Sequence, residues 1–186
     1  IKGNEYDGNK FIDKAILKGA KVVLHSGKIN KNKKVTCIKV NDTRKILAKL
    51  SVKYFKKKPK NIVAVTGTNG KTSVSDFFYQ IFKLQNKNSG FIGTLGFRKN
   101  KYLIKRNLTT LDPLTLNKDL NEMCKSGINN VIIEASSHGL KQKRLDYLSI
   151  KAGIFTNLSH DHMDYHKDMK DYLRSKLILF KRILKK

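Results

Sequence analysis

The feature that most constrains the fold of this chain is an apolar strand that leads directly into a glycine-containing turn and then a helix. Residues 61–66 have the composition of a buried strand, and residues 71 to about 85 have the pattern of a helix. Backbone N–H groups of the turn would point at phosphate oxygens, and the helix N-terminus would add the positive end of its dipole. The predicted ATP-binding residues are Gly67, Thr68, Asn69, Gly70, Lys71, Thr72 and Ser73.

Two side chains at the end of this loop carry specific chemistry. Lys71 would neutralise the β- and γ-phosphates, and the Thr72 hydroxyl would hold Mg²⁺. The general phosphate-loop pattern has a glycine where Val65 stands, and here Gly67 follows two residues later. This departure indicates one subclass of ATP-using enzymes, with ATP and Mg²⁺ as the expected cofactors.

After the loop, short apolar strands alternate with helices. Strands are expected at residues 91–94, 130–134 and 152–155, a hairpin at 97–104 around Lys99-Asn100, and helices at 112–125 and about 167–184. Alternation of this kind is typical of an α/β fold. The prediction is a P-loop-containing, doubly wound and mostly parallel sheet, preceded by part of a small α/β N-terminal domain.

The N-terminal region reads as that small α/β piece. Its expected elements are a helix around residues 11–17, strands at 22–24 and 35–40, and a helix capped at 41–43 that runs to about 55. Residues 56–60, with four lysines and Pro59, are typical of a solvated linker. We therefore expect a partial N-terminal domain at 1–57 and a partial central domain at 58–186. Because the chain starts at Ile1, we expect it to be cut from a longer protein.

The net charge of +26 raises the possibility of a nucleic-acid-binding protein. The charge is spread along the chain, and Lys accompanies abundant Asn and Ile, which share A/T-rich codons with it. Genome composition explains this better than a binding face does, so nucleic acid is not an expected partner. No stretch approaches the roughly 20 apolar residues of a membrane span. Cys37 and Cys124 are interpreted as buried thiols of a reduced, cytoplasmic protein.

Polar side chains follow two of the predicted strands. Glu134 ends one strand, where doubly wound sheets place their ligands, and its carboxylate could hold Mg²⁺ opposite Thr72. The alternative for Glu134 is a helix cap or loop residue. Residues 160–166 contain three histidines and two aspartates. Zinc is disfavoured by the lack of CxxC spacing, so one histidine aiding a magnesium site is the better interpretation. The alternative is a polar helix entry capped by Asp161 or Asp164.

Lys176 lies on the same predicted helix face as Tyr172 and Phe180. A lysine on the apolar side of a helix usually extends its ammonium group to solvent. The residues alone therefore predict a snorkelling side chain.

Taken together, these segments resemble the Mur ligases, ATP-dependent enzymes that extend the peptide of the bacterial cell-wall precursor. The E-x-S-S-H-G-L form resembles the branch that adds the third residue to UDP-N-acetylmuramoyl-L-alanyl-D-glutamate, and residues 3–24 resemble the later part of that branch's first domain. The resembling motifs are, in order, Gly67–Thr72, Thr109-Thr110 with Asp112-Pro113, Glu134–Leu140, Phe155–His166, and Tyr172, Ser175, Lys176, Leu179 and Phe180.

The resemblance implies roles for individual residues. Glu134 and His162 would coordinate magnesium, with Thr72 on the nucleotide-bound ion, and Lys176 would be carbamylated and present negative oxygens to magnesium. Lys71 and Lys176 are thus the implied catalytic residues. Leu108 and His160 depart from the pattern, so His160 receives no catalytic role. The implied contacts of the UDP-muramoyl dipeptide are Thr109, Thr110, Ser136, Gln142 and Arg144.

The implied activity is amide-bond formation in two steps, by a cytoplasmic monomer without membrane insertion. The substrate's γ-carboxylate attacks ATP to give an acyl phosphate, and the amine of a diamino acid then displaces phosphate. Meso-diaminopimelate is favoured over lysine as that diamino acid. A third domain would be missing, so the fragment alone would be inactive. The alternatives are another ligase of the superfamily, such as folylpolyglutamate synthase, a P-loop kinase or NTPase, or a basic nucleic-acid module.

Overall fold

A computed structural model describes residues 1, 3, 7–27, 35–99, 102–105 and 107–184. The chain divides into two compact units, Ile1–Leu47 and Ala48–Lys186. Helix α2 (Thr43–Tyr54) begins in the first unit and ends in the second. The expected domain limit after residue 57 stays a prediction.

The first unit is a small α/β piece, as predicted. A 3-10 turn η1 (Gly8–Phe11) continues into α1 (Ile12–Leu17), and β1 (Val22–His25) pairs in parallel with β2 (Thr36–Lys39). Asp42 accepts a hydrogen bond from the Lys45 backbone N–H at 2.9 Å, which confirms the expected cap of α2.

The second unit contains a six-stranded sheet in the order β6-β5-β4-β7-β3-β8. The four strands from β4 to β8 along this order are parallel, and β5 and β6 form an antiparallel hairpin on one edge. The tip of that hairpin, with Asn100, lies outside the described residues. The predicted α/β fold is confirmed. The strands are β3 (Asn61–Thr66), β4 (Ser89–Gly93), β5 (Gly96–Lys99), β6 (Tyr102–Ile104), β7 (Asn130–Glu134) and β8 (Ala152–Phe155).

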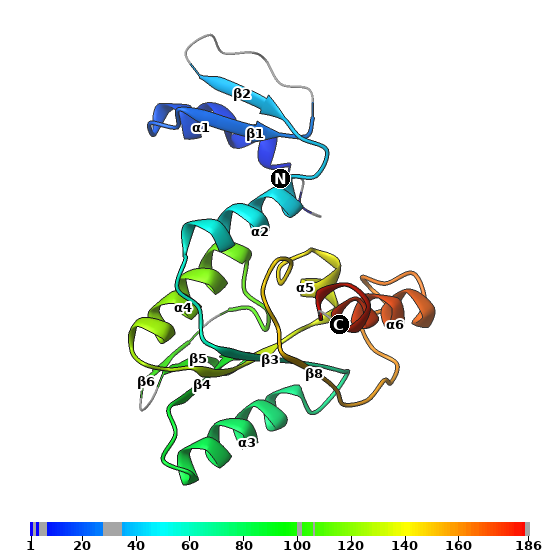
Figure 1. Cartoon of the computed structure of the whole chain (residues 1–186). Coiled ribbons are helices and arrows are strands. Elements are labelled where there is room, and N and C mark those ends of the chain that lie inside the picture. The colour runs from blue at the N-terminus through cyan, green and yellow to red at the C-terminus, as the bar shows by residue number, and fades with distance from the viewer. Residues whose placement is uncertain (2, 4–6, 28–34, 100–101, 106, 185–186) are drawn as a thin grey trace. The chain divides into compact units, whose positions relative to one another are not determined.

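Helices cover both faces of this sheet (Figure 1). Helix α3 (Lys71–Leu84) packs on one face, and α4 (Pro113–Lys125) packs on the other. The side chains of β7 alternate accordingly: Ile132 belongs to the core cluster on the α3 face, and its neighbours Val131 and Ile133 belong to the larger cluster with α4. A strand buried on both sides has to be apolar throughout, which explains the run that predicted it.

After β7, the described part of the chain forms three helical segments besides β8. They are α5 (Ser137–Lys141), α6 (Met169–Ile178) and the π-helical turn η2 (Leu179–Ile183). One continuous helix from 167 to 184 was expected, so the widened last turn is a correction. The Leu184 N–H donates to the carbonyl of Leu179 at 2.9 Å, five residues back, and Leu179 and Ile183 are buried in the larger core cluster.

Three lysines of the segment 56–60 are exposed, as expected for a solvated linker, but the middle of the segment differs. Pro59 is buried, and burial lowers the pKa of Lys58, whose ammonium group donates to the Phe55 carbonyl. This segment therefore packs as part of the second unit. Cys37 and Cys124 are free, as predicted, but each is only partly buried, so the expected full burial was wrong.

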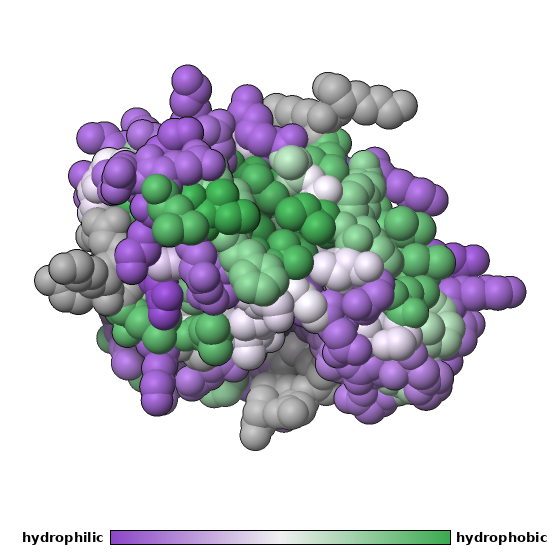
Figure 2. Space-filling view, turned by 90° about the horizontal axis from the view of Figure 1, so that it is seen from below, coloured by the Kyte–Doolittle hydropathy of each residue, from purple (hydrophilic) through white to green (hydrophobic). Residues whose placement is uncertain are grey.

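The outer face of α3 is unusually apolar. Phe77, Ile81 and Leu84 are all exposed at helical spacing, and Leu84 keeps 85% of its surface. Figure 2, which shows the molecule from below relative to the view of Figure 1, shows hydrophobic side chains gathered over this side.

Among the described residues, no helix combines the length and apolar character needed to cross a membrane.

Candidate active site

The loop between β3 and α3 has the backbone conformation of a phosphate cradle. Gly67 and Gly70 take φ values of 151° and 83°, which favour glycine, and Gly70 caps α3. The N-terminus of a 14-residue helix thus opens directly onto the loop. Lys71 folds back over it, and its ammonium group donates to the carbonyls of Gly67 at 3.0 Å and Thr68 at 2.7 Å.

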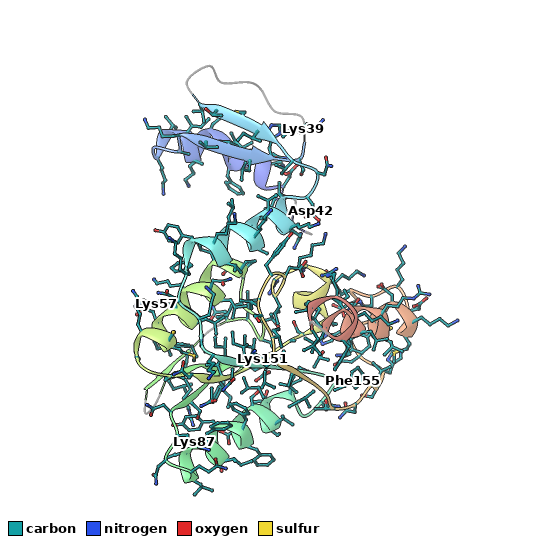
Figure 3. The ribbon with its side chains drawn as sticks, in the orientation of Figure 1. Lys39, Asp42, Lys57, Lys87, Lys151 and Phe155 are labelled. Atoms are coloured by element: carbon teal, nitrogen blue, oxygen red, sulfur yellow. The ribbon has the colours of Figure 1, made fainter. Side chains whose placement is uncertain are left out.

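The segment that follows β8 clamps this loop from the side. β8 ends at Phe155 (Figure 3), and the Thr156 hydroxyl then donates to the Asn69 carbonyl at 2.6 Å. Asn157 bonds the loop through side chain and backbone: its Oδ1 accepts from Asn69 N at 3.0 Å, and its carbonyl accepts from Thr68 N at 3.0 Å. Sequence reasoning gave Asn157 no role, although its position just after a parallel strand could have indicated one.

Glu134 lies fully buried at the end of β7, where its carboxylate collects hydroxyl donors from two other segments. Oε2 accepts from the Thr72 hydroxyl at 3.2 Å and from the Thr94 hydroxyl at 2.9 Å, and Oε1 accepts from Thr94 N at 3.2 Å. The Thr94 hydroxyl also lies 3.1 Å from that of Thr109. Thr94, which follows the neighbouring strand β4, was missed by sequence reasoning. One carboxylate therefore joins the phosphate loop to the predicted substrate-binding threonines.

Gly93 leaves the space that the Glu134 side chain occupies. A Cβ atom added at residue 93 would lie 2.6 Å from Cγ of Glu134 and closer still to its carboxylate. We expect Gly93→Ala to lower the free energy of unfolding by about 1–3 kcal/mol, because the buried carboxylate has to move. Urea titration checks this. The cost should shrink when Glu134 is also alanine, and an equal cost in both backgrounds would refute the packing explanation.

Lys176 is buried, with 1% of its surface exposed, so the snorkelling interpretation was wrong. Its ammonium group donates to the Gly67 carbonyl at 2.6 Å and lies 4.3 Å from the ring centroid of Tyr172. Burial, and next the charge of Lys71, lower the pKa of Lys176 to about 8. Burial also lowers the pKa of Lys71, against the opposing effect of Glu134. Two lysines from distant segments thus meet at one carbonyl of the phosphate loop.

A cavity of about 330 Å³ opens beside these lysines. Of the predicted substrate-binding residues, Gln142 supports the wall rather than lining it, since its Oε1 accepts from the Arg144 guanidinium at 2.7 Å. Arg144 also donates to the Thr110 carbonyl. Leu108, which departs from the family pattern, is part of the wall. The lining residues are Lys71, Asn107, Leu108, Thr109, Thr110, Ser136, Ser137, His138, Arg144, His162 and Lys176.

His162 lines the cavity with a positive φ of 57°, and its Nε2 lies 3.6 Å from the Asp161 carboxylate. Within the part of the chain that the structure describes, no three His, Cys, Asp or Glu side chains form a metal-binding group. The buried Glu134 carboxylate with the Thr72 hydroxyl on it is nevertheless a hard-oxygen pair of the kind that Mg²⁺ prefers. The residues thus fit a magnesium ion that completes its ligands from phosphate and water. His160 is exposed.

His138 lines the cavity and had no predicted role. Its ring lies 3.9 Å from that of Tyr165 and 5.0 Å from that of His162. Burial, and next the nearby His162, lower its pKa to about 4, so this imidazole is neutral near pH 7. The cavity wall therefore combines two lysines, one guanidinium and two imidazoles, of which that of His138 is neutral.

Comparison with known proteins places this chain in a family. The family model described as "Mur ligase middle domain" matches residues 65–186. The UDP-N-acetylmuramoyl-L-alanyl-D-glutamate–2,6-diaminopimelate ligase of Bradyrhizobium diazoefficiens is 42% identical over 184 residues, which cover 99% of this chain and 38% of that protein. The ligase of the same name from Aquifex aeolicus is 40% identical, over 97% of this chain and 37% of its own.

Solved structures agree with this assignment. A structure of a UDP-N-acetylmuramoyl-L-alanyl-D-glutamate–2,6-diaminopimelate ligase superposes with a TM-score of 0.82 at 32% identity, over 93% of this chain and 35% of that one. The MurF ligase of Thermotoga maritima, solved with ADP, shares the fold at a TM-score of 0.59 and 20% identity, over 97% of this chain and 39% of that one. The chain spans about 38% of the length of the curated relatives it matches. Its motifs, its fold and the match to the family model over residues 65–186 show that the chain belongs to the Mur ligase family.

Proposed function

We propose that the protein containing this chain is an ATP-dependent ligase of peptidoglycan precursor synthesis. It joins a diamino acid to UDP-N-acetylmuramoyl-L-alanyl-D-glutamate. Of the two candidate diamino acids, meso-diaminopimelate is favoured over lysine. The observation that carries this proposal is the meeting of Lys71 and Lys176 at the Gly67 carbonyl, on the wall of a cavity lined by Thr109 and Arg144. The names of the relatives at 38–42% identity support the choice of substrate.

The phosphate loop binds ATP in this proposal. The residues from Gly67 to Ser73 offer backbone N–H groups at the N-terminus of α3, and Lys71 supplies a positive charge beside them. Lys71 turns from its carbonyl partners toward the phosphates, where an ammonium group stabilises charge on the transferring phosphoryl group.

Thr72 and Glu134, with His162 and a carbamylated Lys176, hold magnesium. When bound, Mg²⁺ neutralises charge on the phosphates. Burial favours the neutral amine of Lys176, and a neutral amine attacks CO₂ to give a carbamate with loss of one proton. The carbamate turns a buried cation into an anion, which suits a place beside Lys71.

The cavity holds the muramoyl dipeptide in this proposal. Thr109, Thr110 and Ser136 line it, and Gln142 orients the Arg144 guanidinium toward the substrate's carboxylates. The substrate's γ-carboxylate attacks the γ-phosphorus of ATP and releases ADP. The amine of the diamino acid then attacks the acyl carbon, phosphate leaves, and the amine loses a proton.

We further propose that the protein is a cytoplasmic monomer and that neither nucleic acid nor a membrane is its partner.

Nucleotide binding can be tested on the 186-residue chain itself. With Mg-ATP at about ten times its dissociation constant, we expect the melting temperature to rise by roughly 3–5 °C. Lys71→Ala should remove this shift, because the loop loses its cation. Lys83→Ala, an exposed lysine near the far end of α3, is the matched control and should keep the shift. A full shift in the Lys71 variant would contradict the assigned role.

A further inference from the structure

Helix α6 contacts the phosphate loop at two consecutive residues. Lys176 donates to the Gly67 carbonyl at 2.6 Å. One turn earlier on the helix, the hydroxyl of Tyr172 lies 3.2 Å from the hydroxyl of Thr68. Tyr172 has no exposed surface and Thr68 is 7% exposed, so this bond is shielded from water. The two residues are 104 positions apart, and the contact was not expected from the sequence.

The polar groups of Thr68 are all bonded within the protein. Its N–H donates to the Asn157 carbonyl at 3.0 Å, and its hydroxyl oxygen accepts from the Ser159 N–H at 3.0 Å. Its carbonyl accepts from the ammonium group of Lys71 at 2.7 Å. The side chain of this predicted ATP-binding residue therefore fixes the loop to the segment after β8 and to α6.

Two lysines that hold the loop have another task in the proposed function. Lys71 leaves the carbonyls of Gly67 and Thr68 when it turns toward the phosphates. Lys176 leaves the Gly67 carbonyl when it holds magnesium as a carbamate. The bond between the hydroxyls of Tyr172 and Thr68 involves neither lysine, so nucleotide binding does not remove it. Tyr172 then keeps α6 attached to the loop.

We propose that Tyr172 is a positioning residue, whose hydroxyl holds the phosphate loop against α6 through Thr68 while ATP is bound. The proposal rests on the proposed function, in which this loop binds ATP. Neither residue is among the described residues that line the cavity of about 330 Å³. The bond should therefore affect the binding of ATP and not that of the muramoyl dipeptide.

The first experiment is titration calorimetry of the 186-residue chain with Mg-ATP. Tyr172→Phe removes one oxygen atom and keeps the ring beside Lys176. We expect it to raise the dissociation constant about 3–10-fold, because the loop loses one buried hydrogen bond. Tyr54→Phe makes the same change at a tyrosine that is 78% exposed, and it should stay within about twofold of the wild type. An unchanged dissociation constant in Tyr172→Phe would overturn the proposal.

The second experiment separates the hydrogen bond from the packing of the ring. Thr68→Val removes the partner hydroxyl, so adding Tyr172→Phe to it should raise the dissociation constant no further. Thr68→Ser keeps the hydroxyl and should stay within about threefold of the wild type. An equal effect of Tyr172→Phe with and without Thr68→Val would refute the role of the bond. Melting temperatures check folding, and if Thr68→Val does not fold, the dissociation constant of Tyr172→Phe decides alone.

The third experiment measures kinetics in the full-length enzyme. Tyr172→Phe should raise KM for ATP about 3–10-fold and leave kcat and KM for the UDP-dipeptide within about twofold. Tyr54→Phe should leave all three values within about twofold. Equal rises in both KM values would indicate a general loss of structure and would refute a role on the loop.

Failure of the proposed function gives a different result from failure of this inference. If the wild-type enzyme binds Mg-ATP but does not ligate, the ligase function fails, and the calorimetric comparison of Tyr172→Phe with the wild type still decides the role of Tyr172. If the full-length wild-type protein does not bind Mg-ATP, both proposals are refuted.

Discussion

Replacing Lys71 with alanine is expected to lower the ligation rate of the full-length enzyme by about 1,000-fold or more. Lys71 is the cation at the start of α3, and its ammonium group reaches two carbonyls of the phosphate loop. In phosphoryl transfer most of the catalysis comes from positioning and from stabilised charge, so loss of this cation acts on the transition state. Release of ADP and formation of the tripeptide product should fall together.

The control for this prediction is Lys83→Ala, which removes an exposed lysine from the same helix and should keep the wild-type rate. Lys71→Arg separates charge from shape, because guanidinium keeps the charge but is too large for the same place. We expect it to be nearly as slow as the alanine variant. Turnover of the alanine variant at the wild-type rate would refute the ligase assignment for this loop.

Replacing Lys176 with methionine is expected to abolish ligation and, at the same time, to stabilise the protein at pH 7. Methionine cannot form a carbamate, so the proposed magnesium site loses a ligand. The folded protein, however, no longer carries a buried ammonium group next to Lys71. We expect the free energy of unfolding to rise by about 1–2 kcal/mol, since the loss of the hydrogen bond to Gly67 offsets part of the gain.

The gain in the free energy of unfolding on Lys176→Met should depend on pH. The pKa of Lys176 is about 8 in the folded protein, below the ordinary value of 10.5, so the unfolded chain binds more protons between these two values. Wild-type stability should therefore rise from pH 8 to 10.5, and the advantage of Lys176→Met should shrink over the same window. Urea titrations at pH 7 and pH 10 measure this. Lys170→Met, exposed on the same helix, is the control; an equal gain there would refute burial as the cause.

The sequence was sufficient to predict most of the second unit's fold. The predicted bounds of β3, β7 and β8 agree with the structure, because each strand has a short apolar run with polar residues at or next to its ends. The start of α4 was equally clear, since Asp112 caps the helix and Pro113 opens it. Periodicity could not show the π-helical turn at Leu179, whose residues keep an ordinary helical pattern.

The site was less accessible to sequence reasoning. The phosphate loop could be predicted because its residues are contiguous and its chemistry belongs to the backbone. Thr94 and Asn157 could not, because each acts on a residue at least 40 positions away, and ordinary polar residues give no signal of such a contact. Lys176 shows the limit most clearly: on an apolar helix face it was expected to extend its ammonium group to solvent, only the resemblance gave it a role, and the fold places its amine against the phosphate loop.

The carbonyl of Gly67 receives the ammonium groups of both Lys71 and Lys176, at 3.0 and 2.6 Å. One neutral oxygen therefore stands opposite two positive charges, which repel each other and are only partly compensated. The Gly67 carbonyl is the acceptor that the two ammonium groups share, and Lys71 has a second acceptor in the Thr68 carbonyl at 2.7 Å. Any anion that reaches the loop is attracted by both charges at once. If Lys176 itself gains a negative carbamate, the repulsion between the two side chains turns into attraction, and together they hold the loop from two helices.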